Sequence, residues 1–213
     1  MKINNPTEHK MKVGRVQLHG LLFKAPKSDK LVIFAHGSGS SRLSPRNIAV
    51  AEYLASHNIS AFLFDLLTKD EDLDEKNRFD IDLMTKRLVQ VTWWLKNNKE
   101  TQKLKYGYFG ASTGAAAALL ASLHLPEYIK AIVSRGGRPD LALKDLQYIS
   151  CPTLLIVGGA DVQVLKLNQQ ALDELNEVKE LAIVENATHL FEEPGTMEEV
   201  SRLATDWFEK YLI

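Results

Sequence analysis

Residues 106–123 read YGYFGASTGAAAALLASL, and this stretch is the most informative one for the fold. Its first part, 106–110, is a compact apolar run that predicts a buried strand. An alanine-rich helix is expected just after Ser112. Between them, Gly110-Ala111-Ser112-Thr113-Gly114 matches G-x-S-x-G. Because this motif carries a catalytic serine on a turn between a strand and a helix, Ser112 is predicted to be a nucleophile.

The small residues of this motif have a steric reason. A sharp strand-to-helix turn holds its central residue in a strained backbone conformation and brings neighbouring chains close together. The helix that follows points its free N–H groups at the turn, where they favour negative charge. The alternative is an ordinary small-residue helix start after a buried strand.

Further apolar runs alternate with helical patterns along the chain. The helical patterns include a start at Ser44-Pro45, an apolar face from Ile81 to Leu95, and a last helix opened by capping-box spacing at Thr196. This alternation predicts an α/β fold, with a mostly parallel sheet covered by helices on both faces. The remaining strands are expected at 12–23 (as a hairpin), 31–35, 60–65, 129–134, 153–158 and 180–185.

Length and composition favour one globular domain over residues 1–213. The formal net charge of -1 gives no reason to expect nucleic acid or an anionic membrane as a partner. The polar start of the chain, the lack of a long apolar run and the single cysteine predict a soluble, cytoplasmic protein.

A serine hydroxyl needs a base to remove its proton, and His189 is the best placed histidine. It follows the last predicted strand, so it lies at the carboxyl edge of the sheet with Ser112. Asp161 follows the strand at 153–158 and is the first choice for the carboxylate that orients the base, with Asp140 as second choice. Taken singly, Asp161 and His189 could be capping or loop residues. Their chain order with Ser112 is the order found on α/β-hydrolase sheets.

An acyl-transfer site also needs donors for the oxyanion. The backbone N–H of Thr113 is expected to be one donor. The second is assigned to the N–H of Ser38, with Gly39 as a close alternative, in the turn His36-Gly37-Ser38-Gly39-Ser40 after the strand at 31–35. Nucleotide-binding patterns are not present, so this turn is not expected to hold a phosphate.

These residues resemble the α/β-hydrolase superfamily. The HGSGSS turn, the GASTG motif, GGAD at 158–161 and ATH at 187–189 are most similar to the small branch around dienelactone hydrolase, from about residue 12 to 211. The resemblance implies an eight-stranded sheet and a covalent intermediate. Carried over to this chain, it implies Ser112 as nucleophile, Asp161 as acid, His189 as base, and Ser38 and Thr113 as oxyanion donors.

One departure concerns the nucleophile, which in dienelactone hydrolase proper is a cysteine. Cys151 precedes a predicted strand and so is expected at the opposite edge of the sheet from Ser112. Esters or thioesters are therefore expected as substrates in preference to dienelactone. No cofactor and no metal are expected.

Substrate contacts are harder to predict. Only about twenty residues separate the strands at 129–134 and 153–158, so a large lid is not expected. Gly39, Arg138 and Phe191 are candidate substrate-binding residues, although Phe191 could instead pack in the core. Four loop arginines could read an anionic group, but internal bonds are favoured for them: Arg42, Arg46, Arg135 and Arg138.

The function predicted from the sequence is a serine hydrolase that acts through an acyl-enzyme. A non-catalytic binding or signalling protein on the same fold is one alternative. An acyltransferase or perhydrolase with the same triad is another. The acyl group, the leaving group and the choice between monomer and homodimer stay open.

Overall fold

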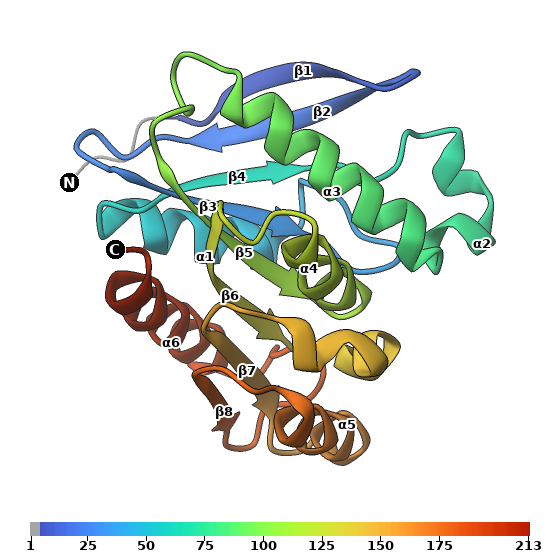
Figure 1. The fold of residues 1–213 in the computed structure, drawn as a ribbon. Helices are drawn as coiled ribbons and strands as arrows, with labels where there is room; N and C mark the ends of the chain where they lie inside the picture. Colours follow the sequence, from blue (N-terminus) through green and yellow to red (C-terminus); the bar gives the residue numbers. More distant parts are fainter. Residues whose placement is uncertain (1–4) are drawn as a thin grey trace.

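The computed structural model describes residues 5–213, in which eight strands form one sheet in the order β1-β2-β4-β3-β5-β6-β7-β8 (Figure 1). Every strand expected from the sequence is present, and the N-terminal hairpin begins earlier than expected. The strands are β1 (Thr7–Val13), β2 (Val16–Phe23), β3 (Lys30–Ala35), β4 (Ser60–Phe64), β5 (Lys105–Ala111), β6 (Ile129–Arg135), β7 (Thr153–Gly158) and β8 (Lys179–Val184).

The sheet is mostly parallel, as predicted. Strands β4, β3, β5, β6, β7 and β8 pair in parallel, whereas β1 with β2 and β2 with β4 pair antiparallel. The six parallel strands therefore end at one edge of the sheet, where their arrowheads lie in Figure 1. The loops after these strands can place side chains from distant parts of the sequence next to each other.

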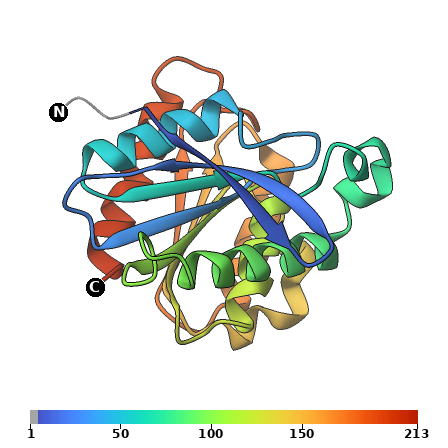
Figure 2. The ribbon, with the colours of Figure 1, turned by 90° about the horizontal axis from the view of Figure 1, so that it is seen from above.

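Helices cover both faces of the sheet, and Figures 1 and 2 show the two layers. Two apolar clusters, one on each side of the sheet, form the core. One face is covered by α3 (Ile81–Lys96), α4 (Thr113–Leu123), the 3₁₀ segment η2 (Pro139–Tyr148) and α5 (Val162–Glu174); α1 (Pro45–Ser56) and α6 (Thr196–Tyr211) cover the other.

Of the two helix starts predicted from capping signals, one is confirmed and the other is wrong. Helix α1 begins at Pro45, and the Ser44 hydroxyl caps it by accepting the N–H of Asn47. The predicted capping box at Thr196 is wrong. Gly195 is the N-cap of α6, and Thr196, one position later, donates its hydroxyl to Glu193 O.

No lid domain is inserted in the described part of the chain. The connection between β6 and β7 contains only η2, as its length predicts. The acidic stretch after β4 folds into two short segments, η1 (Glu71–Leu73) and α2 (Glu75–Arg78), which project at the carboxyl edge of the sheet (Figure 1). This edge therefore carries only short segments.

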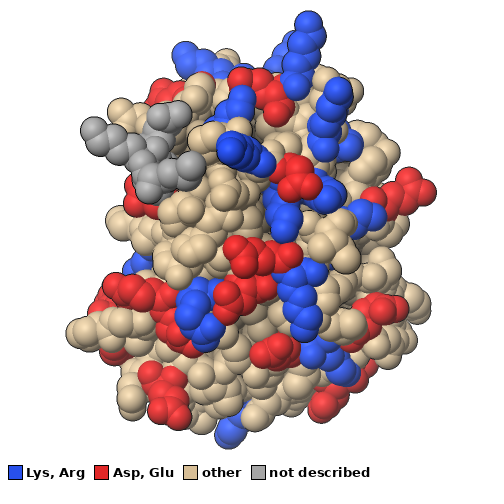
Figure 3. Space-filling model, turned by 90° about the vertical axis from the view of Figure 1, so that its left-hand side faces the viewer, with Lys and Arg blue, Asp and Glu red and all other residues tan. Residues whose placement is uncertain are grey.

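The charged side chains are mixed on the surface, as the balanced charge of the sequence leads us to expect. On the face drawn in Figure 3, positive and negative side chains lie interspersed. Within residues 5–213, no helix is both long and apolar enough to cross a lipid bilayer.

Helix α4 begins in direct contact with the end of β3. A β carbon at Gly114, the second residue of the helix, would overlap the backbone carbonyl oxygens of Ala35 and His36. Only glycine therefore allows the helix to begin this close to the β3 loop. This contact sets the distance between Ser112 and the turn that follows β3.

We predict that Gly114→Ala destabilises the fold by about 3 kcal/mol or more, because the new methyl meets two backbone oxygens that cannot move independently. Gly159→Ala is the matched control. A β carbon there has no neighbour closer than 3.4 Å, so its free energy of unfolding should change by about 1 kcal/mol or less. Urea unfolding of both variants measures the difference, and equal stabilities would contradict the close approach.

Candidate active site

Ser112 lies between β5 and α4 with an unusual backbone conformation. Its φ is +51° and its ψ is -123°, in a region that residues other than glycine seldom adopt. Such a conformation costs of order 1–3 kcal/mol and persists only where the surrounding structure enforces it. Strain of this kind is typical of a functional turn and matches the predicted role of the G-x-S-x-G motif.

Two backbone hydrogen bonds enforce this conformation, one to the last residue of β6 and one to the connection that follows it. The N–H of Ser112 donates to Arg135 O at 3.2 Å, and Ser112 O accepts the N–H of Arg138 at 3.1 Å. On the other side, a β carbon at Gly37 would lie 2.9 Å from the Ser112 β carbon. Ser112 is thus held between the loops that follow β3 and β6.

Asp161 and His189 are joined directly. Asp161 Oδ2 and His189 Nδ1 are 2.7 Å apart, and the ring nitrogen is the donor because a carboxylate can only accept. Asp161 occupies the N-cap position of α5, yet its side chain makes no capping bond. Asp140, the second choice for the acid, forms two hydrogen bonds with Arg138 instead. The structure therefore pairs the two residues that the sequence ranked first.

The loop that carries His189 is fixed against the end of β7. A β carbon at Gly158 would overlap the carbonyl oxygen of Ala187, so the absence of a side chain there lets the loop pass over the strand. Ala160 N–H also donates to Ala187 O at 3.0 Å. The loops of Asp161 and His189 thus form one unit.

Strained backbone also occurs on both sides of His189. Asn186 and Phe191 have φ values of +60° and +54°. Asparagine tolerates this conformation, whereas it is a clear outlier for phenylalanine. The Phe191 side chain is only 1% exposed and belongs to the core. Phe191 therefore packs in the core and anchors the His189 loop there, so it is not exposed to a substrate.

Gly136 brings the Ser112 and His189 loops together. Gly136 directly follows Arg135, the acceptor of the Ser112 N–H, and a β carbon on it would lie 3.6 Å from His189 Cε1. The imidazole is partly open, with 40% of the His189 side chain exposed against 14% for Asp161. Within residues 5–213 no hydrogen bond joins the Ser112 hydroxyl to His189. Catalytic hydrogen bonds are often long before substrate binds.

The expected oxyanion donors lie beside Ser112, but one is engaged. Ser38 N–H donates to the Thr113 hydroxyl oxygen at 2.9 Å. The backbone N–H of Thr113 is at the first position of α4, where a helix has no internal acceptor for it. Gly39, the alternative donor, lies at the tip of the turn with φ +68°. The same turn is closed by Ser40 N–H donating to Gly37 O.

His36, at the base of this turn, has a structural role. Its Nε2 accepts the N–H of Leu66, so its Nδ1–H donates to the Gly37 carbonyl. The ring is buried, and burial lowers the pKa of His36 because the charged form loses its hydration. A neutral imidazole thus ties the β3 loop to the β4 loop.

The four arginines expected in loops are engaged within the protein, as favoured from the sequence, although Arg46 lies in the first turn of α1 and Arg135 is the last residue of β6. Arg42 pairs with Asp65 at 2.6 Å, and Arg46 pairs with Glu192 at 3.2 Å. Arg138, a candidate substrate-binding residue, is held by Asp140.

Arg135 is the buried member of this set. Its guanidinium bonds Asn47 Oδ1 and lies over the Phe191 ring. Burial, with Arg46 nearby, lowers the pKa of Arg135 to about 10. Arg135 therefore supports the His189 loop through Phe191 and holds Ser112 through its backbone carbonyl.

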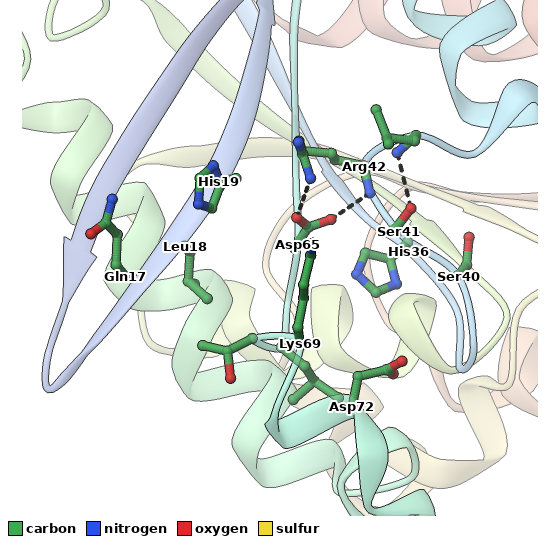
Figure 4. A pocket seen from close by; sticks show the side chains of 13 residues that line it. Gln17, Leu18, His19, His36, Ser40, Ser41, Arg42, Asp65, Lys69 and Asp72 are labelled. Carbon is green, nitrogen blue, oxygen red and sulfur yellow. Dashed lines mark hydrogen bonds and ion pairs between the residues drawn. The ribbon is translucent and has the colours of Figure 1, made fainter.

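A cavity of about 410 Å³ borders the turn at residues 37–41, and Ser112 is not among the residues that line it. It is bounded by β2, the β3 loop and the residues after β4, including Lys69 and Asp72 of the acidic stretch. Figure 4 shows the Arg42–Asp65 pair next to the turn and His19 across from it. Ser40 and Ser41 line the cavity, while Gly37, in the same β-turn as Ser40, contacts Ser112.

Cys151 is not part of this site. It lies before β7, at the amino edge of the sheet, and a strand of six residues spans about 20 Å. The thiol is 6% exposed, and burial raises its pKa to about 12. Among residues 5–213, no three His, Cys, Asp or Glu side chains gather as a metal site would need.

Some contributors were not recognised from the sequence. Gly136 and Gly158 position the loops of Ser112 and His189, and the Thr113 hydroxyl oxygen accepts the Ser38 N–H. The sequence signals are the glycine pairs 136–137, directly after β6, and 158–159, at the end of β7. Their meaning depends on which loop passes over them, which is a property of the tertiary structure.

The fold is that of the α/β hydrolases, and comparison with known proteins identifies the family within that group. The model of the dienelactone hydrolase family matches residues 19–212, so the chain belongs to this family. A crystal structure of a dienelactone hydrolase from Anabaena variabilis is 50% identical, covers 99% of this chain and 100% of its own, and superposes with a TM-score of 0.94. A Pyrococcus furiosus esterase at 20% identity, covering 98% of this chain and 93% of its own, shares the fold, with a TM-score of 0.79.

A curated relative from Mycobacterium tuberculosis has a different name. It is 51% identical over 199 residues, which are 93% of this chain, and is called "Putative phosphoribosyl transferase". The match covers 45% of that protein, so this chain spans less than half the length of its curated relative.

We predict that the stability of this protein falls more steeply between pH 7 and pH 5 than that of His36→Gln. The folded-state pKa of His36 is lowered, so the unfolded chain binds a proton first as the pH falls below about 6.5. The stabilising effect of neutral His36 is complete above that pH and is lost as the pH falls toward the folded-state pKa. Urea midpoints at several pH values measure this, and parallel pH profiles would contradict it.

We also predict that native Cys151 reacts very slowly with dithionitrobenzoate at pH 8. With its pKa raised to about 12, only about one thiol in ten thousand is ionised at that pH. In guanidinium the same thiol should react within minutes. The measurement is the absorbance at 412 nm of the thionitrobenzoate anion that the reagent releases. Rapid labelling of the folded protein would contradict the prediction, because it would show that the thiol is accessible.

Proposed function

We propose that this chain is a serine hydrolase that cleaves small esters or thioesters through Ser112, His189 and Asp161. The observation that carries the proposal is the 2.7 Å contact between Asp161 and His189. Ser112, in the G-x-S-x-G turn that ends β5, has a positive φ and lies at the same edge of the sheet. Membership of a hydrolase family supports the same reaction class.

In the first half-reaction, the Ser112 oxygen attacks the carbonyl carbon of the ester while His189 Nε2 takes the hydroxyl proton. Asp161 holds the Nδ1–H, which leaves Nε2 free to act as the base, and it stabilises the imidazolium that forms. The Thr113 N–H, at the positive end of α4, donates to the developing oxyanion.

The tetrahedral intermediate then collapses. His189 gives its proton to the departing alcohol or thiol, which leaves Ser112 acylated. In the second half-reaction, His189 removes a proton from water as the water oxygen attacks the acyl carbon. His189 then returns that proton to the Ser112 oxygen as the bond to the acyl carbon breaks and the carboxylic acid leaves. An acyltransferase or perhydrolase would replace that water by another nucleophile, and the ratio of products distinguishes these outcomes.

Two features favour small or accessible substrates. No lid domain is inserted between β6 and β7 in the described residues, and the His189 side chain is partly open to solvent. The cavity beside the 37–41 turn has a volume within the usual range for small-molecule sites, about 300–1,000 Å³. None of Ser112, Asp161 and His189 lines this cavity, so it neighbours the proposed site without forming part of it.

The name of the mycobacterial relative belongs to a protein of which the match covers 45%. The aligned 199 residues of this chain form the fold described above, and for them we propose the hydrolase activity.

We expect Ser112→Ala to lower kcat/KM for the best ester or thioester of a graded panel by on the order of 10⁴-fold or more, since the covalent step is lost. Labelling by a fluorophosphonate probe should vanish in the same variant. Ser122→Ala is the matched control. It removes the hydroxyl of a buried serine in α4 that donates to Leu119 O, and it should keep both properties.

Full esterase activity in a well-folded Ser112→Ala protein would refute the assignment of the nucleophile. If the parent protein neither hydrolyses any panel member nor reacts with the probe, a binding or signalling role on this fold would replace the proposed enzyme.

A further inference from the structure

The Thr113 hydroxyl lies beside the nucleophile with an unused hydrogen. Its oxygen accepts the N–H of Ser38 at 2.9 Å, and the residue is only 3% exposed. A backbone N–H can only donate, so this bond uses a lone pair of the threonine oxygen and leaves its O–H free. Among residues 5–213 no acceptor takes that hydrogen. Buried hydroxyls normally donate as well as accept.

We propose that the Thr113 side-chain hydroxyl is an oxyanion donor, and that Ser38 N–H acts through it instead of contacting the substrate. This inference rests on the proposed function. The sequence assigned the backbone N–H groups of Ser38 and Thr113 as the two donors. The structure points instead to two donors on Thr113 itself, its N–H and its O–H.

The geometry of threonine allows both bonds to one oxygen. The backbone nitrogen and Oγ1 of Thr113 are separated by three covalent bonds, so both hydrogens can point at the same acceptor. Thr113 is the first residue of α4, where the N–H is free and the helix dipole favours negative charge.

The bond from Ser38 strengthens this donor. A hydroxyl that accepts one hydrogen bond becomes a better donor in the next, because bonds in a chain polarise each other. Because the bond from Ser38 occupies one lone pair of the Thr113 oxygen, it also restricts the directions in which the O–H can point. No proton moves in this arrangement; the threonine donates a hydrogen bond to the negative oxygen while His189 performs the proton transfers.

The test compares Thr113→Val, which keeps the shape but removes the hydroxyl, with Thr113→Ser, which keeps the hydroxyl. We expect Thr113→Val to lower kcat for the best ester by about 10²–10³-fold with little change in KM, as for loss of a single oxyanion donor. Thr113→Ser should stay within a few-fold of the parent. Thr205→Val, which removes a buried threonine hydroxyl bonded to Ser201 O in α6, controls for the general effect of this exchange.

A second substrate distinguishes the loss of a direct hydrogen bond to the oxyanion from a displacement of the Ser112 turn. In a thionoester, sulfur carries the developing charge and accepts hydrogen bonds weakly, so loss of a donor to that atom should slow its hydrolysis much less than that of the oxygen ester. A variant whose Ser112 had shifted would instead lose both activities equally.

Two results would overturn the inference alone. Unchanged or higher kcat in Thr113→Val would show that the freed Ser38 N–H, or Gly39, serves the oxyanion directly. Equal losses for the ester and the thionoester would show a purely structural role. The proposed function fails separately, if the parent protein has no activity or if Ser112→Ala retains it.

Discussion

Two backbone hydrogen bonds, from Ser112 N–H to Arg135 O and from Arg138 N–H to Ser112 O, hold the serine at positive φ. Each contributes about 1 kcal/mol net, which is comparable to the cost of the strained conformation. They require the chain to leave the end of β6 at a fixed position relative to Ser112. The glycine at 114 meets the same constraint from the opposite side, where α4 abuts the end of β3. The position of the proposed nucleophile therefore depends on three neighbouring strands ending in register.

The proposed base depends on a second close approach. The loop after β8 crosses the end of β7 at Gly158, and this crossing places His189 within hydrogen-bond distance of Asp161. Arg135 connects the Ser112 turn with the His189 loop. Its carbonyl oxygen accepts the Ser112 N–H, and its guanidinium lies over the ring of Phe191, two residues after His189. A buried guanidinium is expensive to desolvate. Its position between the two loops gives a physical reason for keeping it.

Charge is used in this site mainly to hold loops in place. Arg42 and Arg46 pair with carboxylates of other connections, Asp65 and Glu192, and Arg138 pairs with Asp140 of its own connection. His36 stays neutral and uses both ring nitrogens to join the β3 and β4 loops. Around Ser112, the groups available to a developing negative charge are neutral hydrogen-bond donors at the start of α4. Such donors suit a charge that exists only briefly in the reaction, since they are already oriented when it forms.

The α/β sheet and its strand positions could be predicted from the sequence, because buried strands are local patterns. The same patterns predict Asp161 and His189 after neighbouring strands, and these two side chains are in contact. The capping box at Thr196 failed because Gly195 takes the cap and Thr196 bonds backward to Glu193. Local spacing alone does not determine which residue first becomes helical. The sequence also could not reveal that Ser38 N–H is bound to the Thr113 hydroxyl, or that Phe191 packs in the core. These contacts join residues from different strands, so they depend on how the strands align, and only the tertiary structure determines that alignment.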